Sequence, residues 1–445
     1  MPRDRPASSR AETVSTWLIR AVLALIVMRL VEFAPPGITR LRPALLLTIG
    51  TLAFVLWQGA AYGRARLLRG TPMFQAAAGY LGWAMLGIPF ALWPGGAFET
   101  VRAMLVGVLV LVILLLASRR PDALADDIIK TLTVAAVISA LYLFMRGVEV
   151  VQDRFEIGTS LDPNDAAALF AVTAVFALGL ARRATGPRAL AWLACAVVLA
   201  LAIVRTGSRG GTVAILAGLL VLAAGMRGSR RLLYGAMAVA IVAVGWQVAP
   251  ASYKERMIAL ATGEQDYNYT AYEGRKQIWT RGWQYYRANP IVGVGAGNFG
   301  VAEGDRLEIQ GRTGKWSAPH NSYMQAFAEF GTPGGGLFLL LIALAARAGF
   351  HSWRPRARPH QHRPEVLAGL VAFGVASYFL TNAYSFMFFT LFALAALLHR
   401  AQDDPADSAS VPALQGSPEA GAVTRRPRVP VRMPSRAGVG FRARR

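Results

Sequence analysis

Long apolar blocks constrain this chain more than any other feature of its sequence. Clear examples lie at residues 21–28, 106–117 and 335–346. Each belongs to a stretch of about 20 residues with few charges, which is the length that a helix needs to cross a membrane. The short alternating strands that are typical of an outer-membrane barrel are absent. Backbone groups in lipid need internal hydrogen bonds, so the blocks predict membrane-spanning helices.

The whole chain reads as an all-α membrane protein with about 12 transmembrane helices. Hydrophobic residues make up 54% of its 445 residues, which is more than a soluble domain usually carries. The predicted spans are 17–35, 44–62, 73–93, 102–118, 129–146, 165–181, 188–204, 211–226, 232–249, 332–350, 365–382 and 384–399.

Arginine is concentrated in every second connection between these spans. Arg66, Arg183 and Arg354 are examples, whereas the opposite short loops, such as residues 93–99, carry few basic residues. The positive-inside rule therefore predicts that the Arg-rich connections and both termini are cytoplasmic. The formal net charge of +22 is explained by this topology and by contact with anionic lipids, so we expect no nucleic acid partner.

One predicted connection is much longer than the others and lies outside the cytoplasm. It contains aromatic residues, glycines and mixed charge, so it looks folded, whereas the C-terminal tail is rich in Pro, Ala, Ser and Arg and reads as disordered. The predicted division is a cytoplasmic N-terminus (1–16), spans one to nine (17–249), a periplasmic loop domain with short interfacial helices (250–331), spans ten to twelve (332–400) and a disordered basic cytoplasmic tail (401–445).

Two outward-facing segments carry arginine where the positive-inside rule disfavours it. The first, RTGSRGG, holds Arg205 and Arg209 among glycines that permit a tight turn, and the second, at 272–300, holds Arg275 and Arg281 before a glycine-rich turn. Guanidinium groups suit phosphate through bidentate contacts. Each segment is also compatible with a simple interfacial structure whose arginines reach lipid head groups.

His320 is the histidine predicted to face outward, since the other four fall in predicted cytoplasmic segments. Asn321 is placed to cap a short helix, and Gly331 is placed to end it before the next span. His320 is thus a candidate general base, with a purely structural role as the alternative. Asn164, in SLDPNDAA, follows a predicted helix cap at Asp162 and is a weaker candidate for a polar ligand.

Familiar metal and nucleotide motifs are missing from the chain. It contains neither HExxH nor GxxxxGK[ST], and its single cysteine, Cys195, lies in an apolar block. We therefore expect no metal and no cofactor.

Taken in order, the motifs resemble the O-antigen ligase and O-antigen polymerase superfamily of bacterial membrane glycosyltransferases. The most specific match is His320-Asn321, nine residues, Gly331, two residues and Gly334. TGSRGG, the GRxxIW run at 274–279, the GVGAGNF turn and LDPNDAA also resemble the family in pattern and order. The likeness covers roughly residues 150–400 and implies a polyprenyl-dependent, GT-C-like architecture.

The resemblance implies a reaction at the outer face of the bacterial inner membrane. Such enzymes move a glycan from undecaprenyl pyrophosphate to an acceptor hydroxyl without nucleotide or metal. By the motif match, His320 is the general base, and Arg275 and Arg209 bind the pyrophosphate as it leaves. The further candidates for substrate binding are Arg205, Asn321, Arg281 and Asn164.

The acceptor stays open, because three related activities share these motifs. A ligase uses lipid A-core, which we favour; a polymerase uses another lipid-linked glycan; an oligosaccharyltransferase uses protein Ser or Thr. A polytopic transporter is the alternative of a different class. It should need ionisable groups deep in its spans, and few lie there in the predicted spans.

Overall fold

The computed structural model describes residues 6–28, 36–61, 68, 70–117, 120–151, 154–157, 162–262, 271, 274–311, 316–354 and 362–403. Several predicted Arg-rich connections, including 62–67 and 355–361, and the predicted tail from residue 404 lie outside the described residues. The described part of the chain is mostly helical and has few strands.

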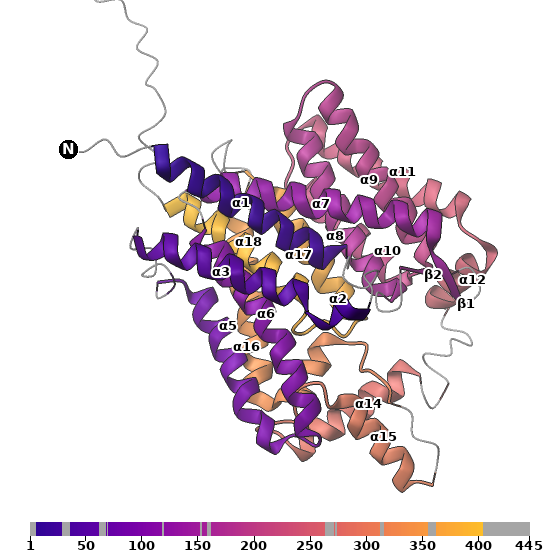
Figure 1. The fold of residues 1–445 in the computed structure, drawn as a ribbon. Helices are drawn as coiled ribbons and strands as arrows, with labels where there is room; N and C mark the ends of the chain where they lie inside the picture. Colours follow the sequence, from indigo (N-terminus) through magenta and orange to yellow (C-terminus); the bar gives the residue numbers. More distant parts are fainter. Residues whose placement is uncertain are drawn as a thin grey trace, which may run out of the picture. The chain divides into compact units, whose positions relative to one another are not determined.

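Helices follow one another along most of the described chain (Figure 1). In order they are α1 (Pro6–Val27), α2 (Pro36–Arg40), α3 (Pro43–Ala61), α5 (Pro72–Gly87), the 3₁₀ turn η2 (Ile88–Phe90), α6 (Pro94–Leu116), α7 (Pro121–Arg146), α8 (Pro163–Arg183), α9 (Pro187–Thr206), α10 (Arg209–Ala224), α11 (Ser229–Val248), α12 (Ala251–Thr262), α14 (Arg275–Ala288), α15 (Phe299–Ile309), α16 (Ser322–Trp353), α17 (Pro364–Ser377) and α18 (Phe386–Asp403).

Proline sets the start of many of these helices. It occupies the first helical position of α5, α6, α7, α8, α9 and α17. The first N–H of a helix has no partner within the helix, so a residue without that N–H costs nothing there, and its fixed φ suits the first turn.

A helix overlaps each predicted span. Within the described ranges, six helices are long and apolar enough to cross a membrane: α6, α7, α8, α9, α11 and α16. Shorter apolar helices occur at Pro43–Gln58, Arg209–Ala224, Pro364–Ser377 and Phe386–Arg400. The chain is therefore a multi-pass membrane protein, and the count of 12 crossings stays a prediction.

The expectation of an all-α chain is wrong at one place. Strands β1 (Val148–Val151) and β2 (Arg154–Glu156) form an antiparallel pair in which Val148 lies opposite Glu156, with an irregular register between Glu149 and Val151. Strands of three and four residues are too short for a two-residue hydrophobic period to emerge from the sequence.

Helix α8 lies at the centre of the packing. Nearly all of its residues from Pro163 to Ala181 are buried, and it packs against α7, α9, α10 and α17. Many of them are alanines, which let neighbouring helices approach closely. A second group of helices, α5, α6, α16 and α18, lies side by side (Figure 1).

One end of α8 is closed by partly buried ion pairs, here called the Glu365 cluster (Asp126, Arg182, Arg183, Arg363 and Glu365). Arg183 contacts Asp126 at 2.6 Å and Glu365 at 3.1 Å, and Arg363 contacts Asp126 at 3.4 Å. Arg182 contacts Glu365 at 3.7 Å. Glu365 is fully buried.

The predicted loop domain contains α12, α14, α15 and the first part of α16. Helix α16 breaks at Gly331, where φ is +65° and ψ is −165°. A Cβ at Gly331 would overlap the backbone at Ile291, so glycine is required both by the conformation and by the close approach. The Thr332 N–H donates to Pro290 O at 2.7 Å and joins the break to the segment after α14. The predicted end of a short helix at Gly331 is confirmed.

Candidate active site

The first element of the site joins the starts of α8 and α10. Asp162 caps α8, and its Oδ1 accepts hydrogen bonds from the backbone N–H and the amide of Asn164, both at 2.7 Å. Ser208 caps α10 and donates from its Oγ to Asn164 Oδ1 at 2.9 Å. A Cβ at Gly211 would overlap Ala167, so this glycine lets the two helices meet. Arg209, the first residue of α10, therefore starts beside the cap of α8.

The second element is the turn that carries His320. Its backbone N–H donates to Thr381 Oγ1 at 3.2 Å, and the next residue, Asn321, caps α16 by accepting from Met324 N at 3.0 Å. Ser322 donates to Leu380 O at 2.8 Å and accepts from Asn382 N at 2.7 Å. The turn is therefore fixed to the connection between α17 and α18.

The backbone at His320 is unusual, because its φ of +45° lies in the left-handed region. Residues other than glycine rarely adopt this conformation, and they are held there by the surrounding structure. Here the hydrogen bonds on both sides of the residue impose it.

The third element is the start of α14. Trp279 Nε1 donates to Pro319 O at 2.9 Å, directly before His320, and its ring meets Tyr378 edge to face with centroids 5.2 Å apart. Arg275, one turn earlier, places its guanidinium carbon 5.9 Å from the ring centroid of Phe379. A Cβ at Gly210 would lie 3.3 Å from the same Phe379. Arg275 and the start of α10 thus converge on one aromatic ring.

Charged groups from three elements act on His320. Burial, Arg275 and Arg154 lower its pKa, and Asp162 opposes them. His320 is therefore neutral at pH 7, the form that accepts a proton. We call His320, Arg275, Arg154 and Asp162 the His320 cluster.

The sequence did not single out Arg154 or the β1–β2 hairpin. Besides bringing Arg154 towards His320, the hairpin places the ring of Phe155 against Arg205, whose guanidinium carbon lies 3.2 Å from the ring centroid. Neither strand is long enough to be recognised, but the run VEVVQDRFEI combines β-branched residues with turn-forming ones and is the signal that could have found the hairpin.

The other predicted site residues have structural contacts. Arg281 is 5% exposed and binds Glu303, its Nε lying 2.7 and 2.9 Å from the two carboxylate oxygens. Tyr285 donates to the same carboxylate at 2.6 Å. Asn321 is a buried cap, and Asn164 links two caps. The structure brings Arg275 and Asp162 to His320, and it holds Arg281 in a separate ion pair.

The glycine-rich turn GVGAGNF connects helices. Gly293, Gly295 and Gly297 all have positive φ, and the Gly297 N–H donates to Glu329 Oε2 at 3.0 Å. Leu92 N donates to Val294 O at 3.1 Å, which joins the turn to the α5–α6 connection. The turn thus clamps α16 to that connection.

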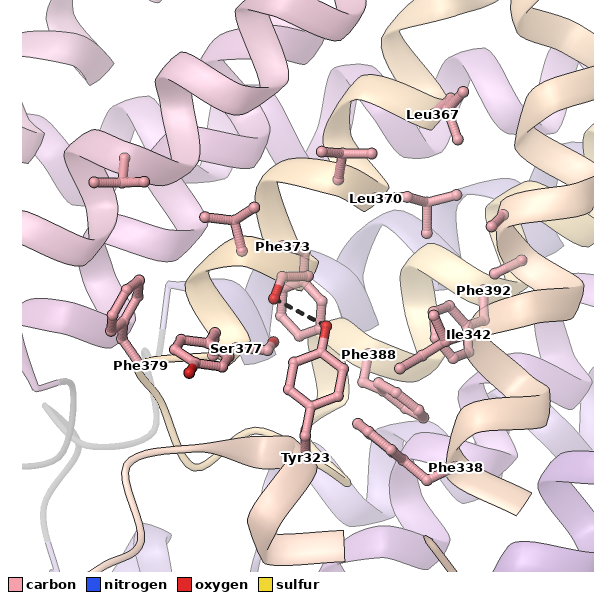
Figure 2. A pocket seen from close by; sticks show the side chains of 17 residues that line it. Tyr323, Phe338, Ile342, Leu367, Leu370, Phe373, Ser377, Phe379, Phe388 and Phe392 are labelled. Atoms are coloured by element: carbon pink, nitrogen blue, oxygen red, sulfur yellow. Dashed lines mark hydrogen bonds between the residues drawn. The ribbon is translucent and has the colours of Figure 1, made fainter. Parts of the chain in front are cut away.

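A large apolar cavity of about 530 Å³ opens next to these elements. It lies between α10, α16, α17 and α18, and its walls are mostly aromatic and aliphatic side chains (Figure 2). Tyr323 stands in it and donates from its hydroxyl to Gly374 O at 3.1 Å. Phe379, the ring that Arg275 and α10 approach, lies at one end of the cavity. The described residues contain no cluster of His, Cys, Asp or Glu suited to a metal.

The family model described as O-antigen ligase matches residues 193–339. No curated protein matches the chain. The matched range begins in α9 and ends in α16, and it includes Arg205, Arg209, Arg275 and His320. Over these residues the chain is therefore similar to the O-antigen ligase family, as the order of its motifs predicts.

Proposed function

We propose that this protein is an O-antigen ligase-like glycosyltransferase. It moves a glycan from undecaprenyl pyrophosphate to an acceptor hydroxyl, lipid A-core being the favoured acceptor, at the periplasmic face of the bacterial inner membrane. The single observation that carries the proposal is the meeting of the 530 Å³ apolar cavity with the guanidinium of Arg275 at Phe379. A polyprenyl pyrophosphate has the same division into a long apolar chain and a compact anionic head.

His320 acts as the general base in the proposed reaction. Its neutral imidazole takes the proton of the acceptor hydroxyl as that oxygen bonds to the anomeric carbon of the glycan. The bond from that carbon to the pyrophosphate oxygen breaks at the same centre, and undecaprenyl pyrophosphate leaves. The depressed pKa of His320 supports this role, because it keeps the imidazole unprotonated at neutral pH.

Arg275 and Arg209 stabilise the negative charge that grows on the leaving pyrophosphate. Fixed guanidinium groups in a partly buried site favour such charge strongly, because they need no reorganisation during the reaction. Arg154 of the hairpin adds positive charge near His320. Arg205, stacked on Phe155, holds the hairpin against α9. Arg281 acts at a distance, by fixing α14 through Glu303.

A reconstituted assay tests the proposal and separates the acceptors. Purified full-length protein in liposomes receives an undecaprenyl-pyrophosphate-linked glycan and one of three acceptors: lipid A-core, a second lipid-linked glycan or a Ser/Thr peptide. We expect glycosylated lipid A-core, also in the presence of excess EDTA, and no product with His320→Ala.

Other products would change the assignment in defined ways. Elongated lipid-linked glycan identifies a polymerase, and glycopeptide identifies a protein oligosaccharyltransferase. Anion uptake into the liposomes without any glycan transfer would identify a transporter and overturn the enzyme assignment. Loss of transfer in EDTA that Mg²⁺ restores would overturn the metal-free mechanism.

A further inference from the structure

A second cavity, of about 320 Å³, lies away from the His320 cluster. It is bounded by the start of α5 and by the last turns of α16 and α18, with Thr71, Arg347, His399 and Arg400 among its lining residues. Helices α16 and α18 both begin at or just after segments that are bonded to the His320 turn. Helix α16 starts at the His320 turn, and the α5–α6 connection is bonded to the glycine-rich turn. The cavity is therefore at the opposite end of the bundle.

Charge in this cavity is of one sign. Arg347 and Arg400 line it together with the imidazole of His399, and none of the described lining residues is acidic. The two groups that α18 contributes have contacts that hold them in place. Arg400 Nη1 donates to Leu115 O at 2.7 Å, and His399 stacks on His351 with ring centroids 5.5 Å apart. The two guanidinium groups face the same cavity and repel each other, so an anion between them is favoured.

The rest of the cavity wall is apolar. Met73, Leu344, Ala348 and Ala396 contribute to it. Leu344 lies on the same face of α16 as Leu340, which is one turn earlier and exposed. An apolar helix face of this kind suits acyl chains, whereas a small inorganic anion would make no use of it.

We propose that this cavity binds the phosphate headgroup of an anionic membrane phospholipid, with Arg347 and Arg400 as the phosphate ligands. Arginine suits phosphate because its planar fork donates two hydrogen bonds at once. In the predicted topology the cavity faces the cytoplasmic leaflet, where basic pockets between spanning helices collect anionic lipids. The proposal is independent of the transfer reaction.

Titration of full-length protein with short-chain phosphatidylglycerol in neutral detergent tests this site. Binding is followed as protection against thermal unfolding, with phosphatidylcholine and inorganic phosphate as separate probes. We expect protection by phosphatidylglycerol alone, and about tenfold weaker binding or more in Arg347→Gln with Arg400→Gln. Arg354→Gln, which changes an exposed arginine after α16, is the matched control and should bind as the unchanged protein does.

Two results would overturn the proposal. One is equal binding of phosphatidylglycerol by the double variant and the control. The other is protection by inorganic phosphate as strong as that by the lipid, which would assign the cavity to a free anion. Arg400 also donates a hydrogen bond to Leu115 O, so the double variant loses that bond. The single variant Arg347→Gln keeps it and gives the same test if the double variant fails to fold.

Discussion

Two clusters of charge lie at opposite ends of α8 and are built differently. In the Glu365 cluster, each arginine has an ion pair with Asp126 or Glu365. In the His320 cluster, two arginines and one carboxylate act on a histidine beside an apolar cavity. Each cluster carries a formal charge of +1, with three arginines against two carboxylates in the first and two arginines against one carboxylate in the second. The neighbouring apolar cavity, more than the net charge or the number of arginines, therefore distinguishes the cluster that can bind a ligand from the structural one.

His320→Ala should give the largest effect on the His320 cluster. We expect transfer to fall about 10²–10⁴-fold, because general base catalysis contributes that much. Protein level and donor binding should stay normal, and both are measured on the purified protein. His320→Gln preserves size and hydrogen bonding; if it restored transfer, His320 would be a structural residue.

Arg275→Lys and Arg209→Lys should each lose about 1.5–3 kcal/mol of stabilisation of the leaving group, or about 10–100-fold in rate. Lysine keeps the charge but lacks the planar fork. Arg287→Lys, near the exposed end of α14, is the matched control. Normal transfer by both Arg275→Lys and Arg209→Lys would show that these arginines take no part in the reaction.

Glu365→Ala should show the opposite pattern. It leaves Arg182 and Arg183 partly buried without their carboxylate, and breaking such a pair costs about 3–5 kcal/mol. The midpoint of thermal unfolding should fall, while transfer per folded molecule is unchanged. A well-folded Glu365→Ala protein without activity would contradict the distinction between the two clusters.

The smallest expected effect is a shift in pH dependence. Transfer should decline as the pH falls through the pKa of His320, which lies below its ordinary value. Asp162→Asn removes a charge that raises this pKa, so the acidic side of the pH–rate profile should move to lower pH. Arg154→Gln removes a charge that lowers the pKa of His320, so the acidic side of the profile should move to higher pH. Rates between about pH 5 and 8 measure both shifts.

Asn is itself a good helix cap, so Asp162→Asn should keep the start of α8 intact. Shifts of the two variants in the same direction would show that the pH dependence does not report on His320.

The local features of the site were predictable from the sequence. Asp162 and Asn321 cap their helices as predicted, and the break at Gly331 is confirmed. These features depend on residues within three or four positions of one another, so the sequence pattern contains the whole interaction.

Features that depend on distant segments were not predictable. The sequence shows Arg281 as one positive charge among several on α14, and its partner Glu303 lies on another helix. The approach of Arg154 to His320 likewise requires the hairpin, α8 and α16 to be packed together. The convergence of Arg275 and α10 on Phe379 depends on the connection after α17, which follows both in the chain.

At position 320 the left-handed backbone favours glycine for stability, whereas the proposed reaction needs histidine. Such a conformation costs any residue with a Cβ about 1–2 kcal/mol, and glycine is spared this cost. His320→Gly should therefore melt at a higher temperature than His320→Ala, although both variants lack the imidazole. Random mutagenesis selected for heat resistance alone would accept glycine at this position, whereas selection for surface glycan would reject it.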